Sequence, residues 1–264
     1  SSIKKDEFNG YKVKHLDSIY AFKENIGVVT LSGNVNYPGK YSISSSDRIL
    51  DVIQRAGGYN EAAYPFGSSL RRESSKELET IFLDKTYRNL ISYIASYPEY
   101  IGGGSGEGLS YILSEIKNHE ALGRLVAEFD LVKLEDNIQY NIILQDQDSI
   151  HIPSYDSNVY IFGEVGNPGS IFFDESSNMI DYINRSGGFT KFSSQESIFI
   201  VSPNGVTQKI QGSGIKKFIS QNYEIYPGSV IYVPRDIGKI EGLNYYATIA
   251  PIFSSLALSI ASLN

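Results

Sequence analysis

Four carboxylates lie close together in the sequence and are the first candidates for catalysis. Glu135, Asp136, Asp146 and Asp148 could supply the pair of acidic groups that glycoside hydrolysis requires. Asp146 and Asp148, however, precede a short apolar strand pattern, where carboxylates commonly stabilise a turn. Turn formation accounts for both residues, and no Ser-His-Asp or His-Glu-x-x-His motif accompanies them. We therefore expect no enzymatic activity.

Metal and phosphate chemistry have equally little support in the sequence. His15, His119 and His151 are far apart and lack zinc-ligand spacing, and the chain has no cysteine. A structural position in a strand explains His151 better than metal ligation does. The glycine-rich segment 102–108 lacks the Lys-Ser/Thr pair of a phosphate-binding loop, so we interpret it as a flexible connector. The sequence predicts neither a metal nor a cofactor.

Aromatic side chains remain as candidates for ligand binding, because the chain has 20 Tyr and 13 Phe but no Trp. The aromatic residues that flank two Gly-Gly pairs could stack on sugar rings or contact another subunit; they are Tyr59, Tyr64, Phe66 and Phe189. Packing in the core or at a subunit interface is the simpler explanation for these four residues. Both interpretations stay open at this point.

An internal repeat organises the elements that carry these residues. Two segments recur at a single offset of 130 residues, 31–41 as 161–171 and 49–59 as 179–189. A third segment, 144–153, recurs as 225–234 at an offset of only 81 residues. The chain therefore contains a duplicated unit, and the first copy carries an insertion.

Each copy has the sequence pattern of a hairpin followed by a short helix. Alternating apolar residues from Val29 to Gly33 indicate a half-buried strand, and Pro38-Gly39 predicts a type II turn after it. The segment 46–56 has helical apolar spacing, and Gly57-Gly58 provides a left-handed stop. A hairpin with a helix packed across it and further strands is the β-grasp arrangement.

The fold class that follows is α+β, with two tandem β-grasp domains and a C-terminal amphipathic membrane helix. Helical patterns at 77–97 and 109–122 make the insertion a helical hairpin. The expected organisation is a closing strand of a preceding unit at 1–22, a first domain at 23–154 with its insertion at about 76–122, a second domain at 155–236 and the helix at 237–264.

The repeated motifs resemble the SLBB (soluble ligand-binding β-grasp) domain. The shared pattern is G-x-V-x-x-P-G, then a helix that ends in Ala/Ser-Gly-Gly-Tyr/Phe, then an apolar strand that ends in Pro. Two such copies before an apolar C-terminus resemble outer-membrane polysaccharide export proteins of the Wza and KpsD type. This resemblance implies a ring of identical subunits with a barrel of C-terminal helices through the outer membrane.

The chain has no Asp, Glu, Lys, Arg or His after Glu241, and its end divides into three helical faces. A bulky apolar face, expected to contact lipid, consists of Tyr246, Ile249, Phe253, Leu256, Ile260 and Leu263. An uncharged polar face, expected to line a pore, includes Asn244, Thr248, Ser255, Ser259 and Ser262. Small residues between them would allow close contact of neighbouring helices; they are Ala247, Ala250, Ser254, Ala257 and Ala261.

Such a helix would extend about 33 Å, which is close to the apolar thickness of a bilayer. Pro251 argues against a continuous span, because an interior proline kinks a helix. A helix that began at Pro251 would extend only about 20 Å. A core helix docked against the second domain therefore remains the alternative to a membrane span.

The net charge of −7 makes nucleic acid an unexpected partner, because nucleic-acid affinity relies on neutralising phosphates. The resemblance implies a subunit of a channel in the outer membrane and periplasm of a Gram-negative bacterium, exporting capsular or exopolysaccharide. Its expected partners are identical subunits, the polysaccharide, outer-membrane lipid and an inner-membrane co-polymerase or export complex. The alternative is a monomeric soluble glycan-binding module with its final helix packed on its own core.

Overall fold

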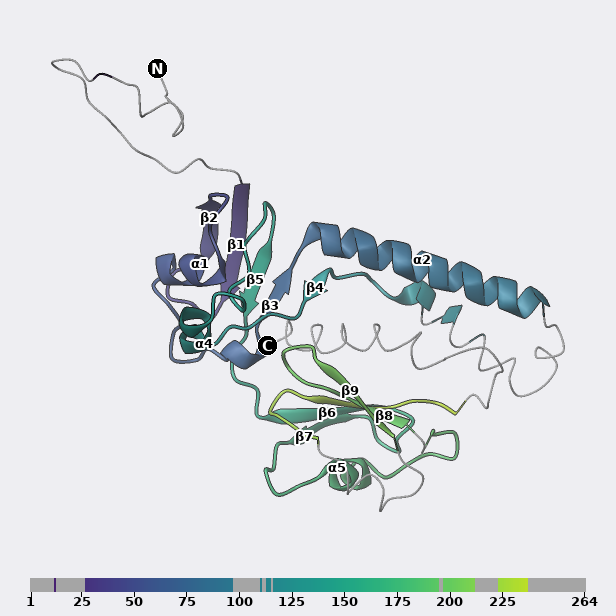
Figure 1. Ribbon diagram of the computed structural model, residues 1–264. Helices are drawn as coiled ribbons and strands as arrows, with labels where there is room; N and C mark the ends of the chain where they lie inside the picture. Colours follow the sequence, from purple (N-terminus) through teal and green to yellow (C-terminus); the bar gives the residue numbers. More distant parts are fainter. Residues whose placement is uncertain are drawn as a thin grey trace.

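The computed structural model describes residues 12, 27–96, 110, 113–114, 116–194, 197–211 and 223–236. These residues form two five-stranded sheets, one for each copy of the repeat, and a long helix extends from the first (Figure 1). Apart from residue 12, the expected closing strand at 1–22 lies outside the described residues, as do the glycine-rich segment 102–108 and the C-terminal helix at 237–264.

The first sheet has the strand order β2-β1-β5-β3-β4. Its strands are β1 (Gly27–Gly33), β2 (Gly39–Ile43), β3 (Ser69–Arg71), β4 (Arg124–Leu125) and β5 (Ser149–Ile152). The β1–β2 hairpin is antiparallel, whereas β1 and β5 run parallel with Leu31 opposite Ile150. Helix α1 (Ile49–Arg55) follows the hairpin, and the short helix α4 (Leu131–Asp136) packs near it.

The second sheet repeats this topology with the order β7-β6-β10-β8-β9. Its strands are β6 (Asn158–Gly163), β7 (Gly169–Phe172), β8 (Ser197–Val201), β9 (Thr207–Gln211) and β10 (Val230–Val233), and helix α5 (Met179–Arg185) follows the hairpin. The parallel pair is now β6 and β10. The predicted succession of hairpin, helix and closing strand is thus confirmed in both copies.

The two hairpin-following helices bury matching faces. Four residues of each helix are buried: Ile49, Leu50, Val52 and Ile53 in α1, and Met179, Ile180, Tyr182 and Ile183 in α5. In the first turn of each helix a carboxylate accepts a backbone N–H group. The Arg48 N–H donates to Asp51 in α1, and the Asn178 N–H donates to Asp181 in α5. The glycine pairs that follow have positive φ, so the predicted left-handed stop is confirmed.

The predicted type II turn in the hairpins is wrong. Such a turn needs a positive φ near +80° at its glycine, but Gly169 has an extended φ of +159°, and Gly39 has a negative φ and starts β2 opposite Leu31. The loop before it is instead anchored to the end of α1, where the N–H groups of Asn36 and Tyr37 donate to Gly58 and Ala56. Anchoring to the helix makes the connection wider than a tight turn.

The insertion begins with helix α2 (Glu73–Ser96), which projects beyond the sheet (Figure 1). The predicted second helix, 109–122, is helical at its described positions up to Asn118 and stops there. Glu79 of α2 explains the early end, because its carboxylate accepts the backbone N–H groups of Leu122 and Gly123 at 3.1 and 2.9 Å. These two N–H groups are therefore held toward α2.

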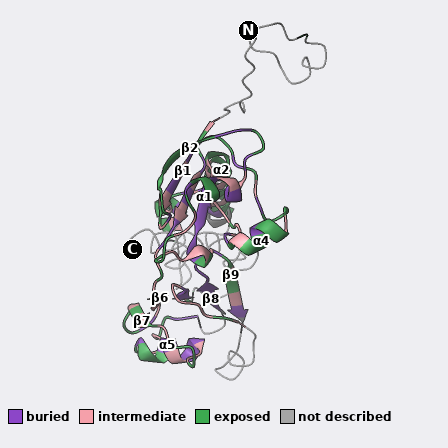
Figure 2. Ribbon diagram, turned by 90° about the vertical axis from the view of Figure 1, so that its left-hand side faces the viewer, coloured by how far each residue is buried: buried purple, intermediate pink, exposed green. Residues whose placement is uncertain are grey.

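Each sheet packs one face on its own core, and the two opposite faces differ in chemistry. Figure 2 shows the buried residues along the strands of both sheets. The first sheet turns Ser69, Arg71 and His151 away from a core that contains Leu70 and Ile150. The second sheet carries apolar or aromatic side chains on the corresponding face, namely Phe199, Val201, Val230 and Tyr232. The two repeats thus share a topology but differ in the side chains on this face of the sheet.

Among the described helices, none combines the length and the hydropathy that a membrane span requires. Helix α2 has 24 residues, but glutamate, lysine, aspartate and arginine interrupt its apolar positions.

Candidate functional site between the repeats

Tyr64 connects the first repeat to the second. Its backbone N–H donates to Pro153 at 2.8 Å, which fixes the residue beside the segment that leads into the second repeat. The following 3-10 turn, η2 (Pro65–Gly67), leads into β3. The Tyr64 hydroxyl donates to the Pro227 carbonyl at 3.1 Å, in the turn before β10. One tyrosine therefore contacts both the linker and the second repeat.

Four aromatic side chains form the aromatic junction, which comprises Tyr64, Phe66, Tyr155 and Tyr226. The centroid of the Phe66 ring lies 4.6 Å from that of Tyr226, and the Tyr64 ring lies 5.4 Å from that of Tyr155 in an edge arrangement. Phe66 is 36% exposed and Tyr155 is 58% exposed. The junction therefore packs the repeats together and still presents ring surface to solvent.

Burial raises the pKa of Tyr64 well above its ordinary value, with smaller contributions from Tyr155, Tyr226 and Asp156. The hydroxyl is consequently protonated at physiological pH and available as a donor. A neutral phenol cannot act as a base at this pH. The chemistry that the junction supports is stacking and hydrogen bonding.

A second contact between the repeats comes from Arg124 of β4. Its Nη2 atom donates to the Pro203 carbonyl at 2.7 Å, in the turn that joins β8 to β9. In the same turn, the guanidinium of Arg124 lies so close to Gly205 that a side chain there would collide with it. The edge strand of the first sheet is thus tied to the second repeat.

The four aromatic residues predicted as glycan or subunit contacts do not form one site. Tyr64 and Phe66 meet in the junction, whereas Tyr59 and Phe189 occupy matching positions in separate repeats, bridged to Val35 and Val165. The Tyr59 hydroxyl donates to the Phe129 carbonyl at 2.6 Å, and its ring packs on the first core. Sequence reasoning missed Tyr155 and Tyr226, whose signal was their position near a proline, Pro153 after β5 and Pro227 before β10.

The carboxylates considered for catalysis have structural roles. Asp146 accepts the Val28 N–H at 2.7 Å, and Asp148 is fully buried in an ion pair with Arg72 at 2.7 Å. Asp148 also accepts the Gln145 N–H across the turn, as Ser229 does for Tyr226 in the second repeat. The turn interpretation of Asp146 and Asp148 is confirmed. Glu135 and Asp136 lie on α4, where Glu135 accepts a hydrogen bond from Gln54 at 3.5 Å.

The histidines are not gathered at a metal site. His151 lies in β5 with Nδ1 3.0 Å from the Ser32 hydroxyl, and His119 pairs with Glu79 at 3.2 Å. Across the described ranges, no group of three His, Cys, Asp or Glu side chains converges on a point that could hold a metal. His15 lies outside these ranges.

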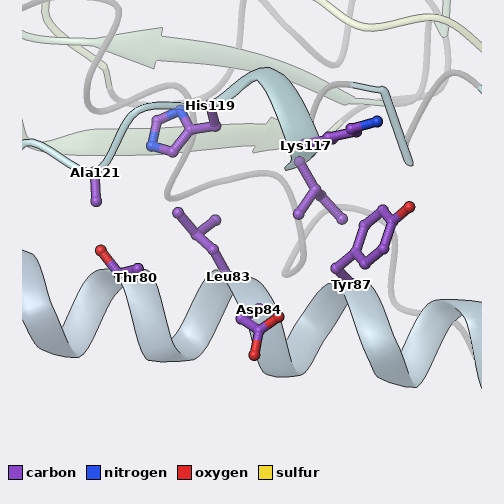
Figure 3. Close-up of a pocket in the computed structure, with 8 residues that line it drawn as sticks. Thr80, Leu83, Asp84, Tyr87, Lys117, His119 and Ala121 are labelled. Carbon is purple, nitrogen blue, oxygen red and sulfur yellow. The ribbon is translucent and has the colours of Figure 1, made fainter.

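A cavity of about 290 Å³ lies between α2 and the segment that returns from the insertion. Figure 3 shows Leu83 and Tyr87 pointing from α2 toward His119 and Lys117 on that segment. The lining is largely apolar. Thr80 donates its hydroxyl to the Lys76 carbonyl, and Asp84 pairs with Arg88. The cavity is therefore suited to holding an apolar group.

The residues predicted for the C-terminal helix lie outside the described residues. They are the pore-lining set (Asn244, Thr248, Ser255, Ser259, Ser262), the lipid-facing set (Tyr246, Ile249, Phe253, Leu256, Ile260, Leu263) and the helix-contact set (Ala247, Ala250, Ser254, Ala257, Ala261).

Comparison with known proteins agrees with the repeat. One SLBB domain model matches residues 28–77 and a second SLBB domain model matches residues 157–233. The polysialic acid transport protein KpsD of Escherichia coli is 32% identical over 81 residues, which are 31% of this chain and 14% of that protein. The similarity thus covers a small part of the length of this relative. The chain thus carries two SLBB domains built on the same sheet topology, and part of it is similar to a polysaccharide transport protein.

Proposed function

We propose that the chain is a non-enzymatic subunit of an oligomeric outer-membrane channel that exports capsular or exopolysaccharide from the periplasm of a Gram-negative bacterium. The observation that carries the proposal is the tandem pair of SLBB domains, together with the similarity to the E. coli polysialic acid transport protein. The carboxylates that might have indicated a hydrolase are occupied in turns and in an ion pair.

In this proposal the two repeats build the wall of a ring of identical subunits. The aromatic junction contributes rigidity, because it joins the repeats through ring contacts and the Tyr64–Pro227 hydrogen bond. The exposed parts of Phe66 and Tyr155 would contact the glycan or a neighbouring subunit. The C-terminal helix would cross the outer membrane with its serine face toward the lumen, and an inner-membrane export complex would be the partner on the periplasmic side.

The cavity beside α2 favours a second candidate function. Its apolar lining, which includes Leu83, Ile116 and Ala121, is typical of a site for a small ligand. In that case the chain would be a monomeric soluble binding module, and the final helix would pack on its own core.

Particle imaging of the full chain distinguishes the two functions. The protein would be extracted from membranes in detergent and compared with the fraction that remains soluble without detergent. A channel subunit should require detergent and appear as a large symmetric ring. A lone globule with the 29.3 kDa mass of the single chain would overturn the channel and favour the binding module.

A further inference from the structure

Two arginines lie opposite each other on the face of the first sheet that is turned away from the core. Arg71 of β3 and Arg124 of β4 are register partners in the antiparallel ladder, one residue along from the pair Leu70–Leu125. Leu70 is fully buried in the first core, so the two arginines project from the other face. Directly opposed side chains in an antiparallel pair have Cβ atoms about 5 Å apart, where like charges repel.

Among the described residues, no acidic side chain forms an ion pair with either guanidinium. The Nε of Arg71 and the Nε and Nη1 of Arg124 are buried and have no hydrogen-bond partner. Arg124 makes its one hydrogen bond to the Pro203 carbonyl, which carries no net charge. Burial, followed by repulsion from Arg71, lowers the pKa of Arg124 to about 10. A buried cation without an anion is costly, so the pair is incomplete as it stands.

The second repeat shows that the fold does not require charges at this position. Its corresponding register pair is Val201 of β8 and Thr207 of β9. The two sheets have the same strand order, and the second forms with an apolar and a hydroxyl side chain where the first has two arginines. The arginine pair therefore has a role other than holding the strands together.

We propose that Arg71 and Arg124 jointly bind one oxyanion, a carboxylate or a phosphate group, at the junction between the repeats. Two guanidinium groups present several N–H donors in a geometry that suits both kinds of group. Thr207 begins the strand after the turn that Arg124 contacts, and its buried hydroxyl has no partner. The position of Arg124 on β4 also favours entry of the oxyanion, because β4 is the edge strand of its sheet.

The oxyanion could come from an acidic sugar or from a free phosphate. The sugar source rests on the proposed function, since it would make the site a contact for an acidic polysaccharide. The phosphate source does not depend on that function. If phosphate binds and the sugar acids do not, the result contradicts only an acidic polysaccharide as the source of the oxyanion. If neither kind of probe binds, the site itself is excluded.

The test measures binding by calorimetry and thermal unfolding of the full chain, with N-acetylneuraminate, glucuronate, inorganic phosphate and neutral glucose as probes. Sodium chloride holds the ionic strength constant, because simple screening would otherwise imitate binding. At least one oxyanion should bind and raise the unfolding temperature, and glucose should do neither. Binding of either sugar acid identifies the first source, and binding of phosphate alone identifies the second.

The decisive variant is Arg71→Val with Arg124→Thr, which places the residues of the second repeat in the first. It should lower the affinity for the oxyanion by more than about tenfold and remove the rise in unfolding temperature. If the double variant does not fold, Arg124→Lys takes its place in the test. This variant keeps the charge but loses the planar guanidinium, so it should bind the oxyanion more weakly than the native chain does. Arg88→Gln, an exposed arginine on α2, is the control and should bind normally. The proposed site would be overturned if glucose bound as well as the oxyanions, if the double variant bound the oxyanion as well as the native chain, or if the native chain bound no oxyanion.

Discussion

Gly33 and Gly163 occupy the same position in the two repeats, at the ends of β1 and β6. Both have left-handed backbone conformations, with φ of +83° and +88°. A Cβ atom on Gly33 would lie 2.0 Å from the Ile152 carbonyl oxygen, and one on Gly163 would lie 2.1 Å from that of Val233. Each carbonyl accepts the N–H of the following residue, Asn34 or Glu164, so a side chain would disrupt that hydrogen bond. This geometry explains the first glycine of the repeated motif.

Gly163→Ala should therefore lower the free energy of unfolding by about 3 kcal/mol, through backbone strain and the displaced carbonyl. Urea unfolding followed by circular dichroism measures the change. Gly39→Ala is the matched control, because a Cβ there meets nothing within 4 Å and the backbone φ is negative. Equal stability of the two variants would show that the close approach to Val233 does not matter.

His151 makes the stability of the first repeat depend on pH. Burial, followed by the nearby charge of Arg71, lowers the pKa of this histidine below its ordinary value of 6.5. The unfolded chain therefore binds a proton more readily than the folded chain does. The stabilisation is present above about pH 6.5 and is lost as the pH falls from there through the lower pKa of the folded state.

We expect the unfolding temperature of the native chain to fall more steeply between pH 7.5 and pH 5 than that of His151→Gln. Calorimetry of the two proteins in the same buffers isolates this histidine, because His119 and all carboxylates are common to both. Parallel pH profiles would mean that His151 contributes nothing to the acid sensitivity.

At the scale of elements, the aromatic junction should make the two repeats unfold together. Tyr64 and Phe66 come from the first repeat, and their partners Pro227 and Tyr226 come from the turn before β10 in the second. Replacing both with alanine, in the variant Tyr64→Ala with Phe66→Ala, removes the ring contacts and the hydrogen bond. Scanning calorimetry should then resolve two transitions where the native chain gives one. Phe172→Ala, a 67% exposed aromatic on β7, should leave a single transition; two transitions in the native chain would contradict the coupling.

The elements that sequence reasoning predicted are those with local signals. Apolar spacing and the glycine pairs located α1 and α5, and alternation located the hairpins, because both depend on residues close in the chain. The turn type at Pro38-Gly39 was not predictable, since it is set by hydrogen bonds to the end of α1. The junction likewise joins Tyr64 to Pro227 and Phe66 to Tyr226, and no periodic pattern connects positions so far apart.

Comparison of the two repeats could have revealed more than either pattern alone. Gln147 has a positive φ of 67°, and Gly228 stands at the corresponding position of the second turn with a φ of 85°. The offset of 81 residues aligns them, so the glycine predicts the backbone conformation of the glutamine. The offset of 130 residues sets Arg71 against Val201, and the strand register then sets its partner Arg124 against Thr207. Differences between copies thus indicate where one repeat has an additional role.

At the scale of the whole molecule, the charge-free C-terminus is the segment that would convert a tandem repeat into a channel. Its serine-rich face would be hidden from lipid only if several copies turned it toward a shared wet lumen. A single docked helix would place the bulky face on the core and leave the serines in solvent. The two arrangements therefore assign opposite surroundings to Ser255 and Ser259.

Ser255→Leu or Ser259→Leu should impair polysaccharide export and reduce the single-channel conductance, because a bulky apolar side chain would narrow and dry a serine-lined lumen. Planar-bilayer recordings of the detergent-extracted protein measure the conductance, and circular dichroism checks that the SLBB domains remain folded. Ile260→Leu places the same new side chain on the opposite face of the helix, so it should conduct like the native chain. If the serine variants also conduct normally, the serine face does not line the pore. A helix docked on its own core predicts that result, since solvent-exposed serines tolerate leucine with a change in stability within about 0.5 kcal/mol.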